Sequence, residues 1–175
     1  MRKPNSKRFL EESVEVLFKT HIPVFVEPLM ECKEKIDLDE KLVVLLRVFV
    51  RISEVLYLTP AECQILLGLN TRSAKCWKYW AKKAAAGKSF SHDKRNKLER
   101  LANLVSIYKL ADALYGDGTG RGTRLWDRNG DPPFGGFSPL EHMLQGHFAQ
   151  LFDVRGYLEP KVRATYNIRP DNGTK

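Results

Sequence analysis

The chain is poor in cysteine and lacks a long apolar run. Its cysteines are odd in number and none belongs to a CxxC pair, which argues against a disulfide framework and a zinc site; they are Cys32, Cys63 and Cys76. The most apolar segment, residues 42–58, is interrupted by two arginines and a glutamate. Nothing therefore approaches the roughly 20 apolar residues of a membrane span. We expect a reduced, cytoplasmic protein without a membrane segment.

The sequence also lacks strand-like alternation and a recognisable catalytic grouping. No stretch of useful length alternates polar and apolar residues, which predicts an all-α fold. His142 and His147 are five positions apart, so on a helix they would face different directions and make a poor metal pair. No Ser/His/Asp or Cys/His set can be traced. We expect a chain that is not an enzyme and has no metal or cofactor.

Positive charge is in excess, and the excess is confined to one segment. The whole sequence carries 29 Lys and Arg against 21 Asp and Glu, a net charge of +8. Residues 1–58 hold ten of each sign and residues 110–175 hold eight of each, whereas residues 59–109 hold eleven basic and three acidic residues. Charge gathered beside a helical motif is typical of a phosphate-binding face. The sequence therefore predicts nucleic acid as a partner.

A pair of helices with a tight turn is predicted within this basic segment. Residues 59–62 (Thr-Pro-Ala-Glu) have the composition of a capped helix start. Cys63 and Leu67 would face inward, Gly68 permits the turn, and Trp77 anchors the second helix. In a helix-turn-helix the second helix lies in the major groove of DNA. The DNA-binding residues predicted on it are Thr71, Arg72, Ser73, Lys75, Lys78, Tyr79, Lys82 and Lys83.

These residues divide into two predicted roles. Arg72, Ser73 and Lys75 lie at the start of the second helix, where base edges are read, and Arg or Lys to guanine is the commonest specific contact. The later lysines are expected to hold phosphates, which sets affinity rather than sequence preference. Gln64 stands where a small residue commonly lets the two helices approach. The alternative is therefore an ordinary helical hairpin with a solvated lysine face.

Two longer helices are predicted around this pair. Residues 37–56 are apolar on most sides, so that helix must be buried, either in the chain's own core or against a second copy in a dimer. A second helix is expected from Ser91, as its N-cap, to Tyr115, with Gly116 as its stop. Its predicted inner stripe consists of Leu98, Leu101, Leu104, Val105, Tyr108 and Ala111.

The last third of the chain begins with a turn-rich loop, residues 129–137. Residues 138–141 (Ser-Pro-Leu-Glu) repeat the capped helix start. A further helix is expected over residues 147–158, ended by Pro160. Composition alone would make this segment a small helical subdomain with Trp126 as its core plug.

This third of the chain resembles a known family. The similarity to the toxin-binding domain of the Xre/MbcA/ParS antitoxins lies in Trp126, Gly135, Gly136, residues 138–141, Met143, Leu144, Gly146 and residues 154–158. Residues 59–77 are similar to the Xre-like DNA-binding half of that family, in the same chain order. The resemblance implies that the carboxy-terminal domain neutralises a toxin of the RES-domain type, which consumes NAD or transfers ADP-ribose. It also implies that the DNA-binding half represses the shared operon.

The resemblance also implies a division of the chain and a set of toxin-binding residues. The expected segments are 1–54, a helical region and candidate dimer contact; 55–115, the DNA-binding domain; 116–122, a Gly-rich linker; 123–160, the toxin-binding domain; and 161–175, a tail. The toxin-binding residues are Trp126, Gly135, Gly136, Ser138, Pro139, Leu140, Met143, Leu144, Arg155 and Tyr157. For Arg155 the alternative is a solvated arginine, which is the commoner case for an arginine on a helix. The rival interpretation is a stand-alone helix-turn-helix regulator without a toxin partner.

Overall fold

The computed structural model of the chain describes residues 37–69, 75–88, 90, 93–116 and 124–166. All the regular elements of these residues are helices, which confirms the all-α class. They are α3 (Leu38–Val55), α4 (Pro60–Leu66), α5 (Lys75–Ala85), α6 (Lys94–Tyr115), α7 (Pro139–Met143) and α8 (Phe148–Thr165). Nowhere in this part of the chain is a helix long and apolar enough to cross a bilayer. The expectations for residues 1–36, 117–122 and 167–175 lie outside it.

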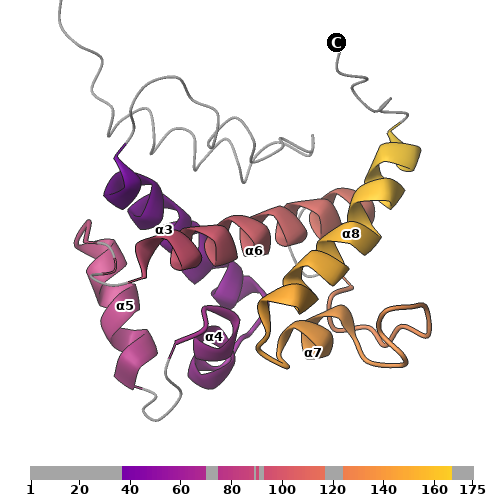
Figure 1. The fold of residues 1–175 in the computed structure, drawn as a ribbon, viewed down its shortest axis with the longest axis horizontal. Coiled ribbons are helices and arrows are strands. Elements are labelled where there is room, and N and C mark those ends of the chain that lie inside the picture. Colours follow the sequence, from indigo (N-terminus) through magenta and orange to yellow (C-terminus); the bar gives the residue numbers. More distant parts are fainter. Residues whose placement is uncertain (1–36, 70–74, 89, 91–92, 117–123, 167–175) are drawn as a thin grey trace, which may run out of the picture.

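Helix α6 organises the fold, because both α3 and α8 pack along it (Figure 1). Its predicted inner stripe is buried, and the helix ends at Tyr115 before Gly116 as expected. Burial extends further round the helix than that stripe, to Asn103, Ile107 and Lys109. A helix covered on several sides shows no single apolar face, so sequence periodicity could find only part of its contact surface. The buried side chains of all the helices form one continuous core.

Helix α3 is buried within the chain itself. Its predicted inner face is almost fully inaccessible, and α3 packs against α6 and α5. The rings of Phe49 on α3 and Trp77 on α5 meet edge to face, with centroids 5.7 Å apart. Of the two alternatives for this helix, the intramolecular core is therefore the one that the structure shows. The apolar face of α3 therefore gives no support to a dimer.

Both capped helix starts have the geometry expected from the sequence. Thr59 Oγ1 accepts a hydrogen bond from the Glu62 amide, and Glu62 accepts one from the Thr59 amide at 2.6 Å. Ser138 and Glu141 form the same reciprocal pair at the start of α7. Each pair satisfies amides that the first helical turn leaves without partners, which fixes where α4 and α7 begin.

The prediction that Ser91 caps α6 is wrong. The helix begins at Lys94, and the residue before it, Asp93, has a left-handed backbone with φ of 52°. The Asp93 side chain makes no capping hydrogen bond. A left-handed residue reverses the chain just ahead of the helix, and Asp is among the residues that tolerate that conformation. Neither feature has a sequence signal as strong as a Ser or Thr cap.

The prediction that Pro160 ends the last helix is also wrong. Helix α8 continues through Pro160 to Thr165. Leu158 and Val162, on either side of the proline, are buried in the core. Burial of these side chains offsets the roughly 3 kcal/mol that an internal proline costs a helix.

Candidate functional site

The turn after α4 has the conformation that Gly68 was expected to allow. Gly68 has φ of 58°, its amide bonds the Ile65 carbonyl, and the Leu69 amide bonds the Gln64 carbonyl at 2.8 Å. This is the hydrogen-bond pattern of a Schellman C-cap, in which a left-handed glycine stops the helix. Cys63 and Leu67 are fully buried beneath the turn, as predicted. The next described element is α5.

Two basic residues of α6 hold the end of α4. Lys97 Nζ donates to the carbonyls of Leu67 at 2.9 Å and Gly68 at 2.7 Å, and Arg100 donates to the Leu66 carbonyl at 3.2 Å. These are carbonyls that a helix end leaves without partners, and a cation there also suits the helix dipole. Burial lowers the pKa of the Lys97 ammonium and of the Arg100 guanidinium. Both cations therefore hold the turn in position by hydrogen bonds to its carbonyls.

The basic segment thus offers a smaller surface charge than its composition suggests. Lys97 and Lys109 are buried, Arg100 is half-buried, and Lys94 forms an ion pair with Asp39 at 2.7 Å. Burial lowers the pKa of the Lys109 ammonium as well. These cations are wholly or partly buried or are paired with an acidic residue. The count of eleven cations overstates what a nucleic acid could meet.

A lysine face remains on α5 and just beyond it, consisting of Lys78, Tyr79, Lys82, Lys83 and Lys88. All except the half-buried Lys83 are exposed. The Lys83 ammonium lies 5.1 Å from the centre of the Tyr79 ring, so the phenol and the cation form one surface. On the opposite side of α5, Trp77 and Ala84 are buried. The helix is therefore anchored on one side and basic on the other.

The end of α5 is held in the same manner as the end of α4. Arg47 of α3 donates from Nε to the Ala84 carbonyl at 2.9 Å and from Nη2 to the Ala85 carbonyl at 3.4 Å. The lysine face thus rests on a helix that is fixed to α3 at its last turn. The predicted base-reading residues are not placed, because Thr71, Arg72, Ser73 and the side chain of Lys75 lie outside the part that the structure describes.

The loop before α7 closes on itself. The Gly136 amide bonds the Asn129 carbonyl at 2.9 Å, and the Asn129 amide bonds the Phe137 carbonyl at 3.1 Å. Gly135 and Gly136 both have positive φ, which is the conformational freedom that this reversal requires. The Phe134 ring, fully buried, fills the space beneath the loop.

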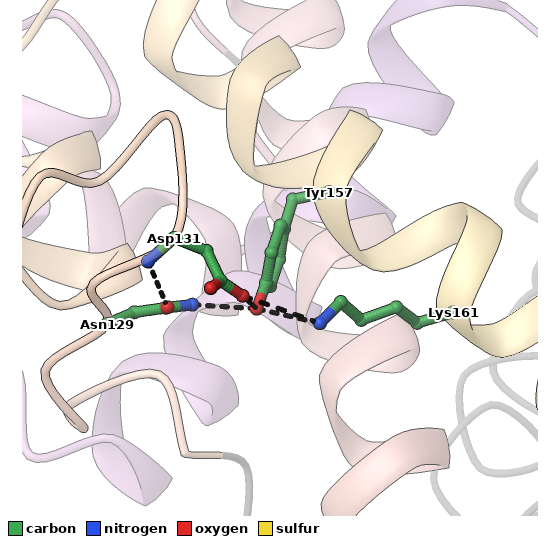
Figure 2. Close-up of polar contacts among 4 residues, drawn as sticks. All are labelled: Asn129, Asp131, Tyr157 and Lys161. Atoms are coloured by element: carbon green, nitrogen blue, oxygen red, sulfur yellow. Dashed lines mark hydrogen bonds and ion pairs between the residues drawn. The ribbon is translucent and has the colours of Figure 1, made fainter.

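The hydroxyl of Tyr157 joins this loop to α8 (Figure 2). It accepts hydrogen bonds from Asn129 Nδ2 and Lys161 Nζ, each at 2.8 Å, and donates to Asp131 at 2.9 Å. A phenol hydroxyl can donate one hydrogen bond and accept two, so its full hydrogen-bonding capacity is used. The Tyr157 hydroxyl raises the pKa of Lys161, mainly through their hydrogen bond. The ring packs edge to face on Phe134 at 4.9 Å. Tyr157 is thus a structural joint as well as a candidate contact.

The residues implied for toxin binding fall into two groups. Four of them are buried and support the loop and α7 from inside: Ser138, Pro139, Leu140 and Met143. Gly135 is exposed, and Gly136 and Leu144 are half-buried. Arg155 donates to Asn103 on α6 at 3.4 Å and pairs with Glu159, so it is not the freely solvated arginine of the alternative interpretation.

Trp126 is an exposed residue rather than a core plug. It is 46% exposed, and its indole N–H donates to the Leu56 carbonyl at 3.1 Å. The neighbouring Leu125 is the buried one, and its carbonyl accepts from the Leu140 amide. The indole is therefore held in place with half of its surface open. This arrangement suits a contact residue, since aromatic side chains with one bonded polar atom are enriched in interfaces.

A pocket and a second exposed aromatic accompany Trp126, and sequence reasoning did not predict them. The pocket has a volume of about 250 Å³ and is lined by Tyr115, Arg124, Leu125, Asp127, Arg128, Asn129, Pro139, Tyr157 and Leu158. The Arg124 guanidinium lies 5.4 Å from the Tyr115 ring. Phe137, at the end of the same loop, is 55% exposed. We call Arg124, Trp126, Arg128 and Phe137 the loop surface. Its two arginines follow the Gly-rich segment, which drew no functional prediction.

Comparisons of the chain with protein-family models, with curated proteins and with solved structures find no match. The lysine face and the loop surface are therefore the structural features from which a function can be inferred. Figure 1 places α5 beside the first turns of α6, while the pocket lies beside Tyr115, the last residue of α6. The lysine face and the loop surface can thus be tested separately.

Proposed function

We propose that the chain is the antitoxin of a type II toxin–antitoxin system. Its lysine face binds operator DNA and represses its own operon, and its loop surface binds and neutralises a RES-domain toxin that consumes NAD or transfers ADP-ribose. Both activities act by occlusion in the cytoplasm, and this chain performs no catalysis. The family resemblance in the sequence is the source of the toxin assignment. The observation that carries the proposal is the presence of two separate surfaces of different chemistry on one core.

The DNA-binding part is supported by the lysine face. Lys78, Lys82 and Lys88 are exposed, and α5 is fixed on its other side by Trp77. Lysines on a rigid helix suit phosphate contacts, whose strength depends on salt. Two copies on a nearly palindromic operator would suit the two-fold habit of helix-turn-helix proteins. Light scattering tests this, and a mass that stays that of a monomer at all concentrations would exclude the dimer.

The toxin-binding part is supported by the loop surface. Its arginines and half-exposed aromatics are the residue types enriched in protein–protein contacts. Phe137 ends the loop of residues 129–137, whose backbone closes on itself and which Tyr157 and Phe134 hold against α8, and the other three residues lie in the segment just before it. A rigid loop loses little conformational entropy on binding.

The experiment disrupts the lysine face and the loop surface one at a time. The tagged chain is co-expressed with the protein encoded by the adjacent gene, and its binding to the upstream DNA is measured by fluorescence anisotropy. We expect Lys82→Ala to weaken DNA binding at every sequence and lower the salt slope by about 1, while the partner is retained. We expect Arg128→Ala combined with Phe137→Ala to lose the partner and keep the DNA. Phe152→Ala, which removes an equally exposed ring from α8, is the matched control.

A stand-alone transcriptional regulator is the second candidate, because the lysine face needs no protein partner for its contacts. It becomes the better account if the chain binds its upstream DNA while no neighbour-encoded protein co-purifies with it. Failure of both DNA binding and co-purification would reject both candidates.

A further inference from the structure

One guanidinium joins the ends of two helices. Arg100 of α6 donates from Nη1 to the carbonyl of Leu66 at 3.2 Å and from Nη2 to the carbonyl of Gly146 at 3.3 Å. Leu66 is the last residue of α4, and Gly146 lies between α7 and α8. The same side chain therefore satisfies a carbonyl at the turn that leads toward α5 and a carbonyl at the α7–α8 junction.

The surrounding contacts leave this side chain little room. A Cβ at Gly68 would lie 2.9 Å from Arg100 Nε, so the guanidinium packs directly against the turn. A Cβ at Gly146 would lie 3.4 Å from Ile65, so α4 and the α7–α8 junction are in close contact. The Arg100 guanidinium also lies 5.3 Å from the ring of Phe148, the first residue of α8. Three elements thus meet around one planar cation.

The two hydrogen bonds are near the upper end of the usual range for N–H···O contacts, which is about 2.7–3.2 Å. A relative shift of α4 against the junction by about half an ångström would therefore lengthen one bond beyond useful range. Arg100 is half-buried and both hydrogen bonds are partly buried, so water replaces a lost partner only in part. A shift of the α4 end relative to the α7–α8 junction therefore costs free energy, and the two positions are energetically coupled.

We propose that Arg100 couples DNA binding at α5 to the conformation of the α7–α8 junction. Any adjustment of the α4 turn on DNA is passed to residues 142–150, and a protein bound near that junction changes the affinity for DNA by the same factor in return. The proposal rests on the DNA-binding part of the proposed function. Arg100 acts here as a positioning residue, since it bonds the carbonyls of Leu66 and Gly146 and is not part of the lysine face.

Lys97 provides a matched control. It bonds the same turn through the Leu67 and Gly68 carbonyls, and neither of these carbonyls belongs to the α7–α8 junction. Replacing either cation with Met keeps an unbranched side chain and removes hydrogen bonds from the α4 end. Only Arg100→Met also removes the link to Gly146. Loss of turn stability alone should therefore affect both variants in the same way.

The test is hydrogen–deuterium exchange of the full chain with and without its upstream DNA fragment. In the wild type we expect DNA to slow amide exchange in residues 75–88 and, on the order of fivefold, in residues 142–150. Arg100→Met should keep the DNA-dependent protection of 75–88 and lose that of 142–150. Lys97→Met should keep both. Arg100→Lys places one nitrogen where the guanidinium has two separate nitrogens, one for the Leu66 carbonyl and one for the Gly146 carbonyl, and should resemble Arg100→Met.

Three results would overturn the coupling. These are protection of 75–88 in the wild type without a change in 142–150, retention of the 142–150 response in Arg100→Met, and its equal loss in Lys97→Met. Absence of protection in 75–88 in the wild type is a different failure, because it rejects the DNA-binding function and the coupling together.

Discussion

Removing the hydroxyl of Tyr157 tests whether the joint between the loop and α8 stabilises the fold. Tyr157→Phe keeps the ring and its edge-to-face contact with Phe134 but removes the three hydrogen bonds of the Tyr157 hydroxyl drawn in Figure 2. A hydrogen bond contributes about 0.5–1.5 kcal/mol net. Asp131 is exposed and Lys161 is partly so, so water replaces their bonds well and the lower figure applies to them. We expect a loss of about 2 kcal/mol of unfolding free energy, about half of it from the bond to Asn129.

The assay is urea unfolding followed by tryptophan fluorescence, with Tyr166→Phe as the control. The Tyr166 hydroxyl makes one hydrogen bond, to the Ala113 carbonyl at 2.9 Å, and is likewise at the surface. Its removal should cost about 0.5 kcal/mol. A Tyr157→Phe loss no larger than that of Tyr166→Phe would refute the reasoning, because the number of bonds would then have no effect.

The same substitution has a predicted pH dependence. The hydrogen bond to Tyr157 raises the pKa of Lys161 above its ordinary 10.5 in the folded chain. A raised lysine pKa stabilises the fold at pH values below the unfolded pKa, and the contribution is lost as the pH rises through the folded value. The stability difference between wild type and Tyr157→Phe should therefore shrink at pH values above 10.5. A difference that grows with pH in that range would contradict the assignment.

Three further substitutions or reactions follow from the structure. Pro160→Ala should stabilise the chain by about 1–3 kcal/mol in urea, because an N–H becomes available to the Gly156 carbonyl within α8; destabilisation would show that the proline conformation is required. Ser138→Ala should lower the unfolding free energy by about 1–2 kcal/mol through loss of the α7 cap, and an unchanged urea midpoint would count against that role. Burial raises the pKa of Cys63 to about 11, so iodoacetamide at pH 8 should modify the half-buried Cys76 first; faster reaction of Cys63, read by peptide mass, would mean that α4 opens.

The parts of the fold that the sequence predicts are those governed by a few neighbouring residues. The boxes at Thr59 and Ser138 depend on a reciprocal contact over three positions, so the pattern alone locates them. Pro160 shows the limit of such local signals. Its effect on α8 is decided by the burial of Leu158 and Val162 against residues distant in the chain, which no window around the proline reveals.

The candidate site has the same limit. Composition correctly finds a basic segment, but Lys82 and Lys97 are indistinguishable in sequence, and only the fold sends one to the surface and the other to the carbonyls of Leu67 and Gly68. On the loop surface, the family resemblance predicted Trp126 as a contact, composition alone would have placed it in the core, and Arg124, Arg128 and Phe137 were not predicted. The neighbour of Trp126, Leu125, is the buried residue. In an irregular loop, adjacent residues can be buried and exposed without a periodic pattern in the sequence.

Because α3 and α8 share α6 as a common support, the two surfaces belong to a single cooperative unit. Unfolding should follow one transition, since loss of α8 would expose the side of α6 that it covers. A substitution deep in α8, such as Val162→Ala, would consequently lower apparent DNA affinity by reducing the fraction of folded molecules, although it lies far from the lysine face. We therefore expect neither surface to work as a separate module, and we expect any partner of the loop surface that stabilises the fold to preserve the lysine face with it.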